Sequence, residues 1–420
     1  IHAYFHTSQH FVITSPDLVA KARQPTRRLS EGERTMEQTW RWFGPHDRVS
    51  LQDTQQAGAT GIVTALHHLP NGVVWSKEEI SRRQDEIRQG ARRTKSHLKW
   101  SVVESLPVSE DIKRQTGDWK THVASYKKSL ANIAECGISV VCYNLMPVLD
   151  WTRTDLRFEL DNGARCMRFD AFDFAAFDLF VLNRKGAAAS YSSDVTQEAQ
   201  IRFSSMDAVD QDRLVANVLC GLPGAEEGYS IASLSEQLAL YHEIDAERLR
   251  TNQIDFLSEV IPTAEQYGIR MCCHPDDPPF PLLGLPRIMS TEQDYVSLVT
   301  DIDSPSNGIT LCTGSLGARS DNDLPGMVDR LGSKIHFAHL RNVTRESAGL
   351  PCSFHESAHL EGDTDMVAVV KALLKEELRR REEGRPDASI PFRPDHGQDI
   401  MSDLQADAQP GYPAVGRLKG

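Results

Sequence analysis

Short β-branched runs alternate with amphipathic stretches along most of the chain. Eight such runs predict strands, at residues 61–66, 98–104, 138–145, 269–273, 309–312, 335–339, 390–393 and 414–418. Between them, residues 76–93, 118–136 and 365–381 predict amphipathic helices. Gly137 and Gly268 come just before two of the strands, where glycine suits a helix C-cap. Because eight strands that alternate with helices favour a closed parallel sheet, the pattern predicts an α/β fold, a (β/α)₈ TIM barrel.

Three stretches depart from this alternation. Residues 155–250 are polar and Ala-rich, and they predict a helical insertion after the third strand, as either a lid or a solvated decoration. Residues 1–35 show no sustained periodicity, so we expect a flexible or extraneous leader before a catalytic domain at 36–420. The last predicted strand ends at Leu418, two residues before Gly420, and we therefore expect the final barrel helix to be missing.

The composition indicates which class of protein this is and which kinds of binding partner fit it. Hydrophobic residues make up 40% and charged residues 25% of the 420 positions, which is ordinary globular usage. A formal net charge of −13 argues against nucleic acid or an anionic membrane surface as a partner, but leaves an acidic small molecule open. No run approaches the ~18 apolar residues of a membrane span. The eight cysteines lack paired C-x-x-C spacing, which favours a reducing cytoplasm.

Four predicted strands end in residues that could bind a metal ion. These are His274, Cys312, His339 and Asp395. The carboxyl ends of barrel strands meet at one mouth, where active sites of this fold are built. Two imidazoles, a thiolate and a carboxylate suit a divalent transition metal and disfavour Mg²⁺ or Ca²⁺. Each residue taken alone has a structural explanation, as a hydrogen-bonded histidine or a small buried thiol.

A second metal-like motif lies at residues 355–359, which spell H-E-x-x-H. In a metalloprotease this motif stands on a helix, with both histidines on one face around zinc. The flanking residues, such as Pro351 and Gly362, indicate a loop instead, so we expect a loop over the barrel mouth that could touch substrate. The chain has no P-loop, no G-x-G-x-x-G after a strand and no G-x-S-x-G.

Several longer motifs resemble those of a known family. They are MEQTWRWFGP (36–45), AGATGIVTAL (57–66), YNLMPVLDWTR (143–153), GLPGAEEG (221–228), HPDDPP (274–279), and the stretch from Gly411-Tyr412 to GRLKG (416–420). Together they closely resemble the mannonate dehydratases of hexuronate catabolism, and the resemblance spans essentially 36–420. Met36 resembles the usual start of that family.

The resemblance implies a xylose-isomerase-like TIM-barrel lyase that converts D-mannonate to 2-dehydro-3-deoxy-D-gluconate and water with Fe²⁺ or Mn²⁺. It places the metal ligands at His274, Cys312, His339 and Asp395, and the acid/base pair at His396 and Tyr412. Relatives often have His where this chain has Gln398, and they usually continue past Gly420 with a final helix.

The chemistry of such a reaction explains why these residue types would be needed. A metal on the substrate carboxylate would stabilise the charge that develops as C2 loses its proton, while an acid protonates the departing C3 hydroxyl. Arg341, Arg41 and Asn144 are candidates for binding the sugar acid. Two alternatives stay open: a metal-dependent sugar or uronate isomerase on the same barrel, and a non-catalytic sugar-acid-binding remnant. A homo-oligomer is left open as well.

Overall fold

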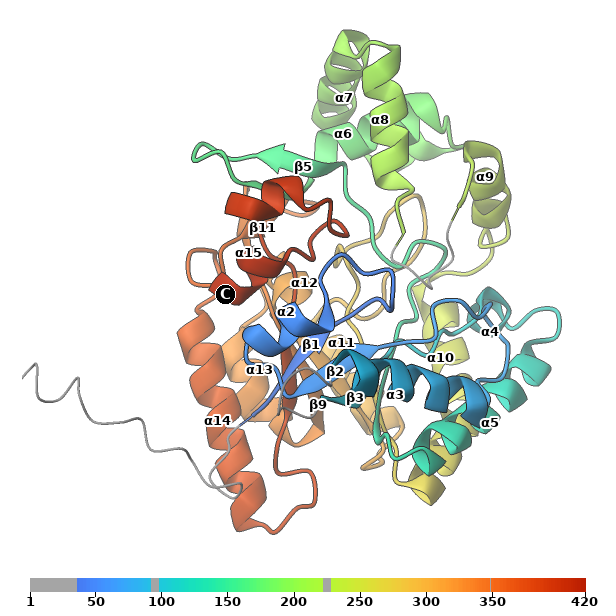
Figure 1. Cartoon of the computed structure of the whole chain (residues 1–420). Coiled ribbons are helices and arrows are strands. Elements are labelled where there is room, and N and C mark those ends of the chain that lie inside the picture. Colours follow the sequence, from blue (N-terminus) through green and yellow to red (C-terminus); the bar gives the residue numbers. More distant parts are fainter. Residues whose placement is uncertain (1–35, 92–97, 222–227, 348) are drawn as a thin grey trace, which may run out of the picture. The chain divides into compact units, whose positions relative to one another are not determined.

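A closed barrel of eight parallel strands forms the centre of the computed structural model, which describes residues 36–91, 98–221, 228–347 and 349–420 (Figure 1). The strands are β1 (Glu37–Arg41), β2 (Gly61–Thr64), β3 (Lys99–Glu104), β4 (Val140–Tyr143), β7 (Arg270–Cys273), β8 (Asn307–Cys312), β9 (Ile335–Leu340) and β12 (Pro391–Pro394). β1 pairs with both β2 and β12 and so closes the ring. The predicted (β/α)₈ barrel is confirmed.

Buried side chains fill the interior of the barrel. Val63, Val102, Val140, Cys142, Cys272 and Phe337 form one inner cluster. A larger cluster lies between the strands and the surrounding helices, and it includes Ile62, Val141 and Ile309. Because the barrel is a packed core rather than a pore, a substrate can bind only at one of its ends.

Two strand predictions were wrong. The first strand, β1, was missed because its sequence EQTWR carries polar residues at most positions. The predicted strand at 414–418 is instead helix α15 (Ala414–Lys419). The carboxylate of Asp403 accepts hydrogen bonds from the backbone N–H groups of Ala414, Val415 and Gly416, which stabilises the free N–H groups of a helix start. With β1 present and 414–418 helical, the barrel still has eight strands.

The three predicted amphipathic helices are confirmed. They are α3 (Lys77–Gly90), α5 (Trp119–Glu135) and α14 (Met366–Glu382). The remaining helices around the barrel are α2 (Leu51–Gln56), α4 (Glu110–Arg114), α10 (Ala246–Tyr267), α11 (Glu292–Asp301), α12 (Thr313–Gly317) and α13 (Leu324–Leu331). Gly268 ends α10 in the left-handed conformation, with φ of +67°, as the C-cap prediction requires.

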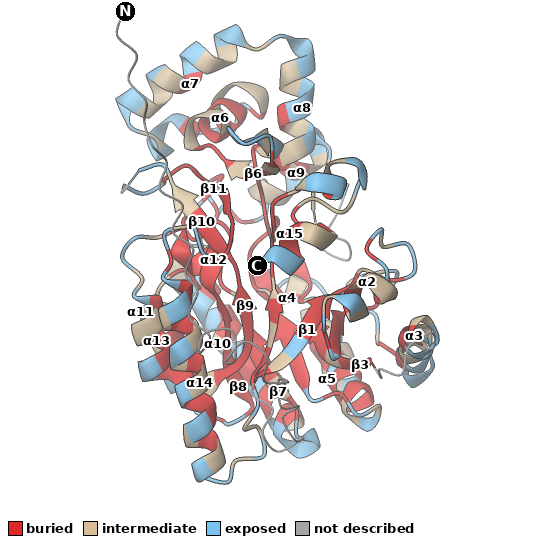
Figure 2. Ribbon diagram, turned by 60° about the vertical axis from the view of Figure 1, so that its left-hand side comes forward, coloured by how far each residue is buried: buried red, intermediate tan, exposed pale blue. Residues whose placement is uncertain are grey.

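An insertion follows β4, which is the third predicted strand and the fourth in the barrel. It begins with a hairpin of β5 (Asp155–Glu159) and β6 (Arg165–Phe169), where helices were expected. Helices α6 (Ala171–Ala176), α7 (Ser193–Ser205), α8 (Ala208–Val218) and α9 (Ile231–Ala239) then follow. α6 to α9 lie beyond one end of the barrel, and the outer faces of α7 and α8 are exposed (Figures 1 and 2). The insertion ends before α10, which is a barrel helix.

A second sheet joins this insertion to the barrel. Its strand order is β10-β11-β6-β5, with β10 (Asn342–Arg345) and β11 (Phe354–Ser357) following β9 along the chain. All its pairings are antiparallel. The H-E-x-x-H motif therefore lies mostly on strand β11: the expectation that it is not helical is confirmed, and the expectation of a loop is corrected.

Among the residues that the structure describes, every helix is too short or too polar to cross a lipid bilayer. The leader predicted for residues 1–35 lies outside the described residues, as does most of the motif at 221–228.

Candidate active site

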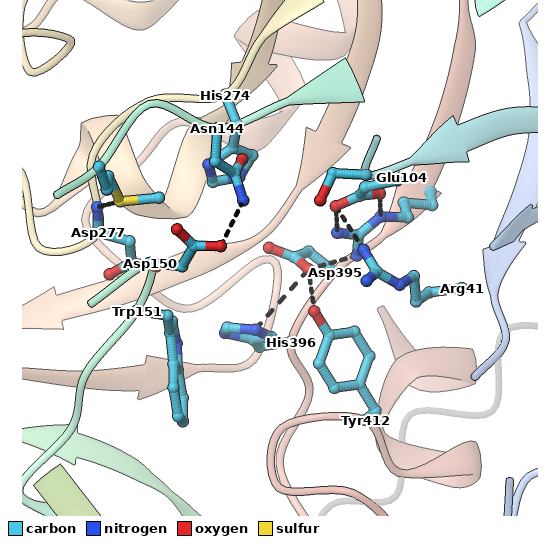
Figure 3. Close-up of a pocket in the computed structure, with 13 residues that line it drawn as sticks. Arg41, Glu104, Asn144, Asp150, Trp151, His274, Asp277, Asp395, His396 and Tyr412 are labelled. Carbon is cyan, nitrogen blue, oxygen red and sulfur yellow. Dashed lines mark hydrogen bonds and ion pairs between the residues drawn. The ribbon is translucent and has the colours of Figure 1, made fainter. Parts of the chain in front are cut away.

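A pocket opens where the carboxyl ends of the barrel strands meet (Figure 3). Its lining residues come from strand ends and from the loops that follow them, and they are Arg41, Glu104, Ser105, Asn144, Met146, Asp150, Trp151, His274, Asp277, Arg393, Asp395, His396 and Tyr412. The sequence brings them together because parallel strands in a barrel all point the same way, so that their carboxyl ends share one mouth.

His274, Cys312 and His339 form a group that could hold a metal ion. One ligand atom from each lies within 4.8 Å of the other two. His274 directly follows β7, Cys312 ends β8, and His339 is the next-to-last residue of β9. The rule that strand ends converge thus places three of the four predicted ligands side by side.

The donor set fits a transition metal. The His274 Nδ1–H donates to the carbonyl oxygen of Pro275 at 2.7 Å, which leaves Nε2 of the neutral ring without a proton. Burial lowers the pKa of His274, and so favours this neutral form. Nε2 of His339 is buried and makes no hydrogen bond with any described residue, and Glu104 Oε2 lies 3.4 Å from it. Two imidazoles and a sulfur are ligands that suit Fe²⁺, Mn²⁺ or Zn²⁺ better than Ca²⁺.

Asp395, the fourth predicted ligand, lies beside this group. Its Oδ2 is 3.7 Å from Cys312 Sγ and 3.9 Å from His339 Nδ1. Burial raises the pKa of Asp395, but the charge of Arg393 and neighbouring groups holds it well below its usual value, so the side chain is a carboxylate. Asp395 therefore places a negative charge beside the sulfur and one imidazole of this group.

Two arginines and Glu104 form the charged floor of the pocket. Arg41 Nη1 lies 2.6 Å from Glu104 Oε1, and Arg393 donates to both oxygens of Glu104 at 2.8 and 3.0 Å. Burial opposes the ionisation of Glu104, but these two cations keep its pKa well below the usual value. Arg393 also pairs with Asp395, so that two cations face two carboxylates and their burial is not prohibitively costly.

His396 and Tyr412 stand at the mouth next to Asp395 (Figure 3). Their rings meet edge to face, with centroids 5.0 Å apart. Nε2 of His396 lies 3.9 Å from Asp395 Oδ1, and the Tyr412 hydroxyl donates to the same oxygen at 3.5 Å. Burial raises the pKa of Tyr412, so this hydroxyl keeps its proton at neutral pH. Two groups that can exchange protons thus border the proposed metal position.

Comparison with known proteins identifies the family. The family model described as D-mannonate dehydratase (UxuA) matches residues 36–420. The chain belongs to the D-mannonate dehydratase family. It is therefore an enzyme, a dehydratase of the lyase class.

Mannonate dehydratase 1 of Agrobacterium fabrum is 58% identical over 385 residues, which are 92% of this chain and 94% of that protein. Mannonate dehydratase of Rhizobium meliloti is 56% identical over the same shares of both chains. The crystal structure of mannonate dehydratase from Streptococcus suis serotype 2 superposes with a TM-score of 0.68 at 32% identity, and covers 91% of this chain and 90% of that one.

Arg341 is not among the residues that line the pocket, and its contact with substrate stays a prediction. Its side chain is fully buried, and its nitrogens donate to Asp277 at 2.6 Å and to both oxygens of Glu356 at 2.7 Å. Arg341 directly follows β9, and its guanidinium lies between Asp277, which lines the pocket, and Glu356 of the second sheet. Its sequence position beside His339 could not reveal this direction.

The other two predicted substrate-binding residues, Arg41 and Asn144, do line the pocket. Nε of Arg41 is buried and makes no hydrogen bond with any described residue. Asn144 Nδ2 donates to Asp150 Oδ2 at 3.3 Å. Sequence reasoning missed Glu104 and Arg393, although both stand at the ends of predicted strands and the strand-end rule would have found them.

The conformation of Gly411 determines how closely the loop that carries Tyr412 approaches His396. It has φ of +78°, and a Cβ there would overlap Met167 Cε and lie 3.1 Å from the His396 ring. Gly411→Ala is expected to cost about 1–3 kcal/mol of unfolding free energy through backbone strain, and to lower kcat because His396 is displaced. Gly163 has a similar φ of +79° but open space around it, so Gly163→Ala is the matched control. Thermal unfolding and kcat of both variants test this: equal activities would show that the contact with His396 is unimportant.

Proposed function

We propose that this enzyme converts D-mannonate to 2-dehydro-3-deoxy-D-gluconate and water, with Fe²⁺ or Mn²⁺ as its cofactor. The observation that carries the proposal is the grouping of His274, Cys312 and His339 beneath a pocket that His396 and Tyr412 border. The relatives named mannonate dehydratase support the substrate. The eight free cysteines agree with action in the cytoplasm, within hexuronate catabolism.

The metal would be held by His274, Cys312, His339 and Asp395. When bound, it supplies Lewis-acid stabilisation of the negative charge that develops next to the substrate carboxylate. These residues lie at or directly after the carboxyl ends of four different strands, β7, β8, β9 and β12. The hydrogen bond from His274 to Pro275 also orients that imidazole before any ion arrives.

His396 and Tyr412 perform the two proton transfers. The reaction removes a proton from C2 and must protonate the C3 hydroxyl, because hydroxide is a poor leaving group. C2 and C3 are neighbouring atoms, and the two side chains are also neighbours, with ring centroids 5.0 Å apart. One group can therefore serve each carbon. The enol product then forms the 2-keto acid.

Arg41 and Asn144 bind the sugar acid. Arg41 brings a cation to the pocket lining, which suits an anionic substrate. Asn144 and Asp150 lie on the opposite side of the pocket in Figure 3, where an amide and a carboxylate suit hydroxyl groups.

Incubation of anaerobically purified protein with D-mannonate tests the proposal. With Mn²⁺ or Fe²⁺ present, we expect a 2-keto-3-deoxy acid that a thiobarbiturate assay detects. Removal of the metal by a chelator should abolish product formation, and addition of Mn²⁺ should restore it. Conversion of mannonate without any 2-keto-3-deoxy acid would instead indicate an isomerase, and no conversion with either metal would indicate a protein that only binds sugar acids.

A further inference from the structure

Glu356, the glutamate of the H-E-x-x-H motif, has no part in the function described so far. It lies on β11 and is fully buried. Its Oε1 lies 3.1 Å from Nδ1 of His396, and both of its oxygens accept hydrogen bonds from Arg341. Arg153 donates to the same carboxylate at 3.2 Å. Strand β11 of the second sheet thus places a carboxylate beside Nδ1 of His396, while the other ring nitrogen faces the pocket.

We propose that Glu356 is a positioning residue, which fixes the ring orientation and the tautomer of His396. The proposal rests on the acid/base role proposed above for His396. The proposal gives the H-E-x-x-H motif a role without a metal ion. Neither histidine of the motif belongs to the group that could hold an ion, and His359 Nε2 instead donates to the carbonyl oxygen of Leu340 at 2.8 Å.

The contact with Glu356 determines which ring nitrogen of His396 carries the proton. An ionised carboxylate can only accept hydrogen bonds, so Nδ1 of His396 must carry a proton. Burial raises the pKa of Glu356, but the charge of Arg341 and the hydrogen bond from His396 bring it down to about 2, so the carboxylate is ionised at neutral pH. In the neutral ring, Nε2 is then unprotonated, and it is this nitrogen that faces Asp395 and the pocket.

The carboxylate itself is held rigidly. Arg341 and Arg153 each bind Glu356 on one side and Asp277 on the other, so two cations and two carboxylates form a closed, buried quartet. Gln398 Nε2 also donates to the backbone carbonyl oxygen of Glu356 at 3.2 Å. A rotation of the Glu356 side chain would break ion pairs in a buried site, which is strongly unfavourable. The orientation of His396 is therefore determined by the junction of the second sheet with the barrel.

Two variants separate positioning from stability. Glu356→Gln keeps the shape of the side chain, but its amide can rotate and donate to Nδ1, which would move the ring proton to Nε2. We expect kcat to fall about 10²–10⁴-fold with KM changed less than about threefold. The control is Arg380→Lys, which weakens another buried ion-pair cluster, with Glu376 and Asp387, away from the residues that line the pocket. We expect it to lower the unfolding temperature while kcat stays within about threefold of the unmodified enzyme.

Nitrogen-15 NMR of the full chain with labelled histidine gives a readout that does not depend on activity. Loading with diamagnetic Zn²⁺ keeps the signals sharp, and His396→Asn identifies the resonance. We expect the proton on Nδ1 in the unmodified protein and in Arg380→Lys, and on Nε2 in Glu356→Gln. A proton on Nε2 in the unmodified protein, or equal losses of kcat in both variants, would overturn the proposal. A proton on Nδ1 combined with full activity of His396→Asn would instead overturn the role proposed for His396 and leave the contact intact.

Discussion

His396→Asn is expected to lower kcat by about 10²–10⁴-fold while the metal content stays unchanged. His396 reaches the pocket with Nε2 and is not part of the group that could hold an ion. Asparagine can still accept or donate a hydrogen bond near Glu356, but it cannot take up a proton at neutral pH. The loss should therefore appear in kcat, measured from the rate of 2-keto-3-deoxy acid formation, with metal content measured on the same samples.

The matched control for this prediction is His336→Asn. His336 is a buried histidine at the start of β9, outside the residues that line the pocket, and its nitrogens make no hydrogen bonds with described residues. We expect this variant to keep kcat within about twofold per folded molecule, because no proton transfer depends on it. If His396→Asn were as active as this control, His396 would have no part in acid/base catalysis.

Cys312→Ser is expected to reduce metal content and turnover together. A serine hydroxyl is a far weaker ligand for a transition metal than a thiolate, and one ligand of the proposed set would be lost. Loss of an outer hydrogen-bonding partner alone costs about 10–100-fold in metal affinity, so removal of a direct ligand should cost at least as much. Titration of the metal-free protein with Mn²⁺, followed by the activity at each concentration, measures both effects.

Cys352→Ser provides the comparison. Cys352 is also buried, but its thiol donates to the carbonyl oxygen of Ala318 at 3.2 Å, a bond that a serine hydroxyl can replace. We expect this variant to bind Mn²⁺ like the unmodified protein. Unchanged metal affinity and turnover in Cys312→Ser would remove Cys312 from the ligand set and leave the two histidines without their third partner.

The position of the site could be predicted because it follows from a simple rule. Once the chain alternates strands and helices, the carboxyl ends of parallel strands must meet, and residues such as His274 and His339 are brought together although 65 positions separate them. The rule fails where a strand is not recognised. β1 carries Glu, Gln, Thr and Arg among five residues, and its pairing with β2 and β12, rather than its own pattern, makes it a strand.

This rule cannot decide whether a short apolar run forms a strand or a helix, and it cannot tell where a side chain points. Residues 414–418 suit a strand or a helix equally well by pattern, and the carboxylate of Asp403, eleven positions before Ala414, stabilises the helix. Arg341 stands two residues after His339, and nothing in its neighbourhood along the chain shows that its guanidinium is held by Asp277 and Glu356.

The sequence by itself determined the barrel, the mouth at which its chemistry gathers and the residue types that could hold a metal, because these depend on periodicity and on strand polarity. Only the tertiary structure decided which polar groups satisfy one another. Burial makes an unpaired charge so costly that each arginine and carboxylate must find a partner, and the partners come from distant segments. The same sheet junction that buries Arg341 thereby places Glu356 behind His396.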